Sequence, residues 1–360
     1  MRSFRQVVRT MLTNGPKLLL TGAAVFVAGA LEPVSTASAA AEPAASAVPA
    51  ASAAPKDIYK ERMQMFEMAG TITGIPWYEL AAVDQYERAM GRVRKLPTAS
   101  SSIAIHFSEV DWAGALNPNL QDTSPASIAL FRGVGRDGDG DGQANRLNDV
   151  DRLSAMAALM VKQGLSADDR RRSLWNYYQN DRSVERIGQF ARIYQQFGRL
   201  DLHEQAFVMP LNAEYSYRST WGAKRGWGGR RIHEGTDVFA SHGVPVRSAC
   251  YGIVEVKGWN PYGGWRVGIR DLNNVYYYFA HLSGFPKELK LGKVVKPGEV
   301  LGWVGSTGYG RPGTSGKFPP HLHFGMYRDN GYSDWSFDPY SYLRKWEREE
   351  RRRANAERSK

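Results

Sequence analysis

The sequence predicts a multidomain protein of the α plus β class, in which a mostly helical domain precedes an antiparallel β-sheet domain. The chain has 360 residues, 42% of them hydrophobic, which is enough for about two or three domains with cores of their own. Apolar residues recur at helical spacing over residues 57–200, where alternating patterns are scarce. Over residues 201–345, β-branched and aromatic residues alternate between glycines and asparagines, which is typical of strands and turns.

The first 56 residues are expected to form a signal peptide and a linker. Basic residues precede an apolar run from Leu18 to Leu31, and Ala37, Ser38 and Ala39 form a typical cleavage site. We therefore predict a signal peptide over residues 1–39, and a secreted protein that is not an integral membrane protein after cleavage. The alternative is an uncleaved anchor. Residues 40–56 are mostly Ala, Ser and Pro, which predicts a disordered linker.

Charge and cysteine content point to the bacterial envelope. An exported chain with Cys250 as its only cysteine holds together without an internal disulfide, as bacterial envelope proteins often do. Cys250 is predicted to be a small buried hydrophobe, because a nucleophile would need a base nearby. The net charge of +11 predicts attraction to anionic wall polymers rather than to nucleic acid. Residues 346–360 are predicted to be a charged tail that forms a solvated, frayed helix.

One acidic residue of the helical domain is a candidate general acid. Pro76 predicts the start of a helix, and Leu80, Val83 and Glu87 then recur at helical spacing. A carboxyl group that continues an apolar stripe is partly desolvated, which raises its pKa toward the range of a general acid. The alternative is that Glu87 lies at the edge of the stripe and pairs with a nearby base such as Arg88.

A glycine-rich loop in the same domain has the spacing of a calcium site. Asp137, Asp139 and Asp141 alternate with glycines, and Gly142 occupies the sixth position, as in an EF-hand-like loop. The twelfth position is Asn148, where a glutamate is usual, and Asp149 and Asp151 are close by. We predict that the three aspartates bind Ca²⁺; the alternative is a turn with solvated acids.

These two stretches resemble lytic transglycosylases of the membrane-bound type B family. The resemblance implies a lysozyme-like fold for residues 57–200, and it places the catalytic glutamate of that family at Glu87. The sequence is much shorter than members of that family, and Arg88 stands where they have Thr or Ser. Both cleavage of glycan strands and glycan binding without cleavage therefore stay open.

The β domain contains candidate ligands for a metal ion. A hydrolytic zinc site needs three protein ligands and one open position. His233, Asp237 and one histidine of the HLH cluster supply that set. Alternate residues of a strand face the same side, so His321 and His323 are expected to point into one cleft. The alternative is that these histidines are structural or incidental, as we expect for His106, His203 and His242, which have no ligand-like setting.

The same motifs resemble the LytM and lysostaphin zinc endopeptidases. The resemblance rests on the H-x-x-x-D of HEGTD, the histidine that ends YYYFAHL, and the H-x-H of PPHLHFGMY. It implies that His233, Asp237 and His323 bind Zn²⁺, and that His281 and His321 are catalytic without binding the metal. The implied reaction is zinc-assisted hydrolysis of a peptide bond, with His281 and His321 as base and oxyanion stabiliser in an order that stays open.

The expected function is therefore that of a secreted, wall-associated bacterial peptidoglycan hydrolase that cleaves peptide cross-bridges. The alternative is a non-catalytic wall-binding or regulatory module on the same fold, against which the complete ligand set argues. The loops of the cleft determine which bond is cleaved, and the sequence pattern does not define it.

Overall fold

The structure is a computed structural model that describes residues 57–95, 101–225 and 231–359. The predicted signal peptide (1–39) and linker (40–56) lie outside the described residues. All of the described helices and strands belong to one compact unit. Within these residues, no helix is both long enough and apolar enough to cross a membrane.

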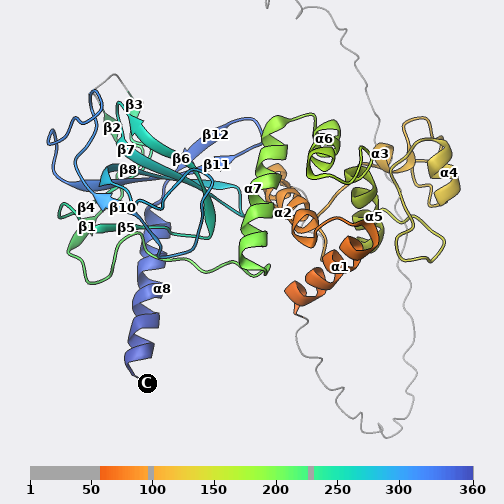
Figure 1. Cartoon of the computed structure of the whole chain (residues 1–360), viewed down its shortest axis with the longest axis horizontal. Coiled ribbons are helices and arrows are strands. Elements are labelled where there is room, and N and C mark those ends of the chain that lie inside the picture. Colours follow the sequence, from red (N-terminus) through yellow and green to blue (C-terminus); the bar gives the residue numbers. More distant parts are fainter. Residues whose placement is uncertain (1–56, 96–100, 226–230, 360) are drawn as a thin grey trace, which may run out of the picture. The chain divides into compact units, whose positions relative to one another are not determined.

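The N-terminal part of the described chain is helical, as predicted (Figure 1). Its helices are α1 (Ile58–Thr73), α2 (Trp77–Arg94), α3 (Glu109–Ala113), α4 (Pro125–Leu130), α5 (Asp149–Met160), α6 (Ala167–Tyr178) and α7 (Asp181–Phe197). The Asp57 carboxylate caps the start of α1, and Gly74, in the left-handed region at φ 74°, ends it. The core of this helical part is built around α2, where Leu80 and Val83 are fully buried.

The rest of the described chain forms an antiparallel β part that ends in one long helix (Figure 1). Its elements are β1 (Tyr215–Tyr217), β2 (Lys224–Arg225), β3 (Arg231–Ile232), β4 (Thr236–Ala240), β5 (Pro245–Arg247), β6 (Gly252–Asn260), β7 (Gly264–Asp271), β8 (Val275–Gly284), β9 (Val294–Val295), β10 (Val300–Val304), β11 (His321–Asp329), β12 (Asp334–Phe337) and α8 (Tyr340–Arg358). The main sheet runs in the order β1-β4-β11-β8-β7-β6-β9, with β10 beside β5 and β8 and with β12 beside β11. The pairings are antiparallel, which confirms the predicted sheet type.

Strand β11 separates the core of the β part from the face that carries the histidines. Leu322 and Phe324 are fully buried in the core, and His321 and His323 alternate with them on the other face. Helix α8 covers the core face, where Trp346 packs against Phe324 with ring centroids 6.1 Å apart. The two histidines of β11 therefore point away from α8.

Helix α8 agrees with the helix predicted for the tail, but it corrects the expectation that this helix is solvated all round. The helix begins at Tyr340 and continues through most of residues 346–360. Trp346 is 1% exposed, and Glu350 accepts a hydrogen bond from Phe207 N at 2.8 Å and pairs with Arg247 at the same distance. The many charges of this segment hid the helix face that packs on the sheet, because its few inward-facing residues are widely spaced in the sequence.

Buried charges join α7 to the sheet. Arg186 of α7 forms ion pairs with Glu255 of β6 and, at 3.2 Å, with Asp329 of β11. Glu255 also pairs with Arg270 of β7 at 3.1 Å, and Asp329 pairs with Arg182 of α7 at 3.4 Å. Because each carboxylate contacts more than one guanidinium group, the charges are compensated although they are buried. We call these five residues the junction network.

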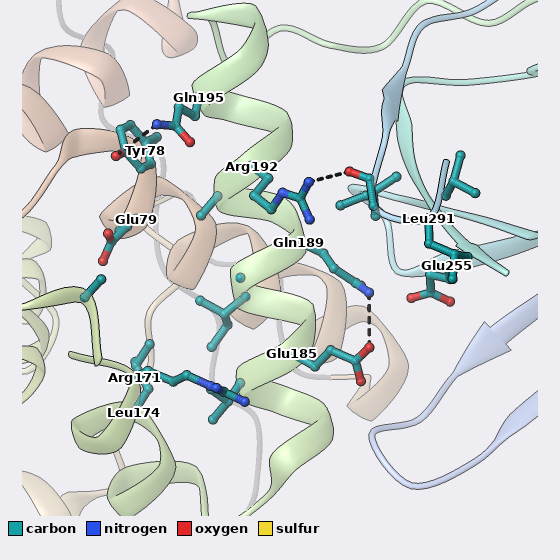
Figure 2. Close-up of a pocket in the computed structure, with 18 residues that line it drawn as sticks. Tyr78, Glu79, Arg171, Leu174, Glu185, Gln189, Arg192, Gln195, Glu255 and Leu291 are labelled. Carbon is teal, nitrogen blue, oxygen red and sulfur yellow. Dashed lines mark hydrogen bonds between the residues drawn. The ribbon is translucent and has the colours of Figure 1, made fainter. Parts of the chain in front are cut away.

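Next to the junction network, a cavity of about 700 Å³ lies along α7 (Figure 2). Arg192 of α7 donates to the carbonyl oxygen of Gly292, and Gln189 donates to Glu185 within the helix at 3.4 Å. The lining residues come from α2, α6 and α7, and from β6 and the turn before β9. They include no histidine or cysteine, so this cavity is separate from the candidate metal centre.

Candidate metal centre

His233, Asp237 and His323 bring three potential ligand atoms together. His233 follows β3, whereas Asp237 and His323 lie opposite each other on the paired strands β4 and β11. His233 Nε2 is 2.8 Å from His323 Nδ1, and each of these atoms is 3.1 Å from Asp237 Oδ1. A tetrahedral zinc ion with bonds of about 2.0–2.1 Å holds its ligand atoms roughly 3.3 Å apart. Both the chemistry and the separation of these atoms therefore fit Zn²⁺.

Backbone contacts orient two of these side chains. His233 Nδ1 lies 2.9 Å from the carbonyl oxygen of Thr220, to which it must donate because a carbonyl oxygen only accepts. This hydrogen bond turns His233 Nε2 toward Asp237 and His323, where it can serve as a metal ligand. At Gly235, a Cβ atom would lie 2.5 Å from the carbonyl oxygen of Phe324 and 2.8 Å from His323 Cε1. Glycine is therefore required for His323 to approach this closely.

The protonation states of the ligand residues suit a metal site. Burial alone would raise the pKa of Asp237, but hydrogen bonds to His233 and His323 hold that pKa well below its usual range. Burial lowers the pKa of His323. Asp237 is therefore ionised and His323 is neutral at neutral pH, as metal ligands need to be.

His281 and His321 lie beside the three ligand residues, with ring centroids 4.8 Å apart. His281 Nδ1 donates to the carbonyl oxygen of Thr307 at 2.7 Å, and His321 Nδ1 donates to that of Pro319 at 2.8 Å. His321 Nε2 is 3.7 Å from Asp237 Oδ1. Burial, followed by the charges of the neighbouring histidines, lowers the pKa of His281 to about 3. Its ring is therefore neutral at neutral pH, with Nε2 as the hydrogen-bond acceptor.

A cleft of about 400 Å³ opens beside these histidines, and tyrosines form much of its lining. Tyr276 and Tyr278 come from β8, and Tyr327 comes from β11. Glycines leave room for the phenol groups: a Cβ atom would lie 2.0 Å from Tyr276 Oη at Gly268, and 2.2 Å from Tyr278 Oη at Gly263. The metal centre therefore lies in a cleft with aromatic walls, rather than on an open surface.

Several residues of this site escaped the sequence analysis. Thr220 and Thr307 act through their carbonyl oxygens, which no side-chain pattern reveals. Gly235 lies inside the HEGTD motif, and its position between two predicted ligands could have indicated that the site requires a glycine there. Arg231 and Arg266 line the cleft, but they come from separate strands that only the fold brings together.

Glu87 of α2 is 8% exposed and lines a cavity of about 570 Å³ in the helical part. Tyr178 Oη donates to Glu87 Oε1 at 2.7 Å, whereas Arg88 pairs with Asp84 at 3.2 Å. Burial raises the pKa of Glu87. The desolvation expected from helical spacing is therefore present, and the alternative pairing with Arg88 is not.

The acidic loop differs from the predicted calcium set. Asp137, Asp139 and Asp151 place carboxylate oxygens within 4.8 Å of one another, and Asp141 is not part of this group. Asp151 lies in the first turn of α5, is fully buried, and accepts a hydrogen bond from Gly138 N at 2.8 Å. Asp151 is close to the loop in sequence, but loop spacing alone did not include it in the ligand set, because the start of α5 turns it back toward Asp137. A cation at this loop would bind the group with Asp151.

The other histidines and the cysteine belong to neither group of candidate metal ligands, although His106 and His203 line the cavity that contains Glu87. His106, His203 and His242 are exposed, in agreement with the expectation that they are not ligands. Cys250 is buried, and burial raises the pKa of its thiol well above the usual value. The thiol is therefore neutral, which agrees with the interpretation of Cys250 as a small buried hydrophobe.

Residues 231–335 match the family model described as peptidase family M23. The chain is 54% identical over 294 residues to the L-Ala--D-Glu endopeptidase of Bacillus subtilis (strain 168), a match that covers 81% of this chain and 90% of that protein. The match spans more residues than the range 201–360 contains, so it also includes much of the helical part.

Other matches are shorter. The chain is 34% identical over 115 residues to lysostaphin of Staphylococcus staphylolyticus, which covers 31% of this chain and 22% of that protein. The solved catalytic domain of lysostaphin from Staphylococcus simulans is 30% identical and covers 37% of this chain and 93% of that domain, with a TM-score of 0.30.

Proposed function

The chain belongs to peptidase family M23, and from this premise we propose that it is a zinc-dependent endopeptidase that cleaves peptides of bacterial peptidoglycan. The observation that supports this most strongly is the convergence of His233, Asp237 and His323 beside His281 and His321. The bond that we propose is the one between L-Ala and D-Glu. It is the bond named for the Bacillus subtilis relative, of which this chain covers 90%.

In this proposal, His233, Asp237 and His323 hold the zinc ion. When bound, zinc polarises the scissile carbonyl group and lowers the pKa of water. His281 and His321 each donate Nδ1–H to a backbone carbonyl, so Nε2 of each ring is ready to accept a proton. One of them accepts the proton of the attacking water, and a protonated ring donates a hydrogen bond to the negative charge that develops on the carbonyl oxygen. That proton then passes to the amide nitrogen as the C–N bond breaks.

The test is hydrolysis of a soluble peptide with an L-Ala–D-Glu bond by the full chain with one equivalent of zinc. Mass spectrometry should detect a product with a new amino-terminal glutamate. His281→Ala should keep the zinc but lower kcat/KM by roughly 10²–10⁴-fold, as expected for loss of a proton-transfer group. His242→Ala removes an exposed histidine and should match the wild type. Zinc-loaded wild-type protein that yields no product would contradict the proposal and favour a non-catalytic wall-binding module.

We also propose that the protein is exported and acts at the cell wall. The N-terminal pattern of residues 1–39 and the net charge of +11 support this proposal. Mass spectrometry of protein recovered from culture medium should find a mature N-terminus at Ala40. Binding to anionic wall polymers should weaken as salt is added, and export of an uncleaved chain would contradict the proposed processing.

For the helical part, we propose a lysozyme-like unit that binds glycan in the cavity lined by Glu87. The observation that favours it is a buried carboxyl group with a raised pKa at the wall of a cavity of about 570 Å³. Anhydro-muropeptides that are released by the wild type and vanish in Glu87→Gln would extend the proposal to glycan cleavage. Equal binding of purified glycan strands by the two proteins, without such products, would exclude a role for Glu87.

A further inference from the structure

Two arginines line the cleft beside the candidate metal centre. Arg231 lies on β3 and Arg266 on β7, and both line the cleft of about 400 Å³ together with His233, His281 and His323. A guanidinium group stays charged at any working pH, and its planar donors match the two oxygens of a carboxylate. The cleft therefore carries two permanent positive charges close to the site of reaction.

Arg266 lacks the ionic partners that a nearby arginine of the same strand has. Its guanidinium carbon is 5.9 Å from the ring centroid of Tyr278, and the Tyr278 ring meets the ring of His323 edge-on, also at 5.9 Å. Arg266 Nε is buried and finds no hydrogen-bond acceptor among the described residues. Arg270, four residues further along β7, pairs with Glu255 at 3.1 Å. Arg266 is thus a charged group close to His323 that contacts Tyr278 but forms no ion pair with a described carboxylate.

Arg231 is likewise linked to a histidine, His281, through one tyrosine. It donates to Tyr309 Oη at 3.1 Å, and Tyr309 stacks on His281 with ring centroids 5.9 Å apart. The carboxylate that lines the same cleft, Glu234, accepts a hydrogen bond from Tyr327 Oη at 3.3 Å and forms no ion pair with either arginine. Both positive charges therefore remain available to a ligand.

The proposed substrate carries a free carboxylate next to the scissile bond, which the two arginines of the cleft could bind. Cleavage between L-Ala and D-Glu makes the amino group of the glutamyl residue the leaving group. A glutamyl residue within a peptide uses one carboxyl group to continue the chain and keeps the other free, whichever of the two it uses. The free carboxylate therefore belongs to the residue next to the scissile bond, and arginine is well suited to bind it through two parallel hydrogen bonds.

We propose that Arg266, assisted by Arg231, binds the free carboxylate of the D-glutamyl residue on the leaving side of the scissile bond, and so selects this bond. The inference rests on the proposed endopeptidase function. It concerns substrate selection, whereas His281 and His321 handle the proton.

The experiment compares two substrates: a soluble peptide with an L-Ala–D-Glu bond, and the same peptide with the free carboxyl group of that glutamate converted to a carboxamide. The wild type should cleave the carboxylate peptide with a kcat/KM higher by roughly 10- to 100-fold, the value of a charge-assisted hydrogen-bonded pair. Arg266→Gln should lose most of this preference by cleaving the carboxylate peptide more slowly, with little change for the carboxamide.

Matched variants keep the test decisive. Arg231→Gln changes an exposed residue, and a partial loss of preference in this variant supports the inference even if Arg266→Gln fails to fold. Arg328→Gln removes an exposed arginine of β11 that lies over Phe337, at 4.6 Å, and it should behave as the wild type on both peptides.

The outcomes separate the inference from the function on which it rests. Equal cleavage of both peptides by the wild type, or equal losses on both peptides in the two cleft variants, would overturn the inference and leave the endopeptidase proposal intact. Zinc-loaded wild-type protein that cleaves neither peptide would overturn both.

Discussion

Replacing Gly235 by alanine should disrupt the zinc site while the rest of the protein stays folded. The added methyl group would lie 2.8 Å from His323 Cε1 and 2.5 Å from the carbonyl oxygen of Phe324. Ordinary contact begins at 3.4 Å, so the imidazole ring has to move by about 0.6 Å. Metal sites tolerate deviations of roughly 0.2 Å in ligand distances. We therefore expect zinc affinity to fall by at least about 10- to 100-fold, as it does when a supporting contact of a ligand is lost.

The assay is a competition titration of zinc-stripped protein against a chromophoric chelator. Gly188→Ala is the control, because a Cβ atom at this exposed position of α7 meets nothing within 4 Å and should leave zinc affinity unchanged. Circular dichroism of the metal-free proteins should show that both variants keep their secondary structure. A folded Gly235→Ala protein that binds zinc as tightly as the wild type would refute the steric argument.

Arg186→Met should lower the free energy of unfolding by about 3 kcal/mol in urea denaturation, the lower end for breaking a buried ion pair, because Glu255 and Asp329 keep their other arginines. An effect below about 1 kcal/mol, the size expected for an exposed pair, would contradict this. Glu87→Gln should raise the melting temperature more at pH 7.5 than at pH 4. Burial raises the pKa of Glu87 in the folded protein. The contribution of neutral Glu87 to the stability of the protein is therefore fully present below the pKa that Glu87 has in the unfolded chain, and it is lost as the pH rises through the pKa of the folded state. No pH dependence of the difference would show that the carboxyl group is not desolvated. We propose that Asp151, rather than Asp141, completes a Ca²⁺ site with Asp137 and Asp139, so calcium should raise the melting temperature of the wild type and of Asp141→Asn but not of Asp151→Asn. The reverse pattern would support the ligand set expected from loop spacing, and no effect on the wild type would contradict both sets.

The sequence predicts those parts of the fold that local periodicity controls. The stripe of Leu80 and Val83 identifies α2, and the alternation of His321 and His323 with buried residues identifies β11. It does not predict that the helical and β parts share one compact unit. That arrangement depends on contacts between residues far apart in the sequence, such as the hydrogen bond of 2.7 Å from Gln85 Nε2 to the carbonyl oxygen of Leu272. Such contacts leave no periodic pattern in the sequence from which they could be predicted.

The same distinction applies to the candidate site. Side-chain chemistry and spacing indicate His233, Asp237 and one histidine of the HLH cluster as metal ligands, whereas the choice of His323 depends on the resemblance to the LytM and lysostaphin endopeptidases. The Thr220 carbonyl that orients His233 has no such mark, because every residue has a carbonyl group. Asp151, although close to the loop in sequence, was left out of the predicted ligand set for a related reason: a rule based on loop spacing cannot include a residue that the next helix brings back.

The junction network limits how this protein can be divided. A cassette that starts at residue 201 would leave Glu255 and Asp329 without Arg186, and it would uncover Ile253 and Leu272, which pack into the core of the helical part. An engineered chimera or a recombination event that moves the catalytic sheet must therefore bring α7 with it.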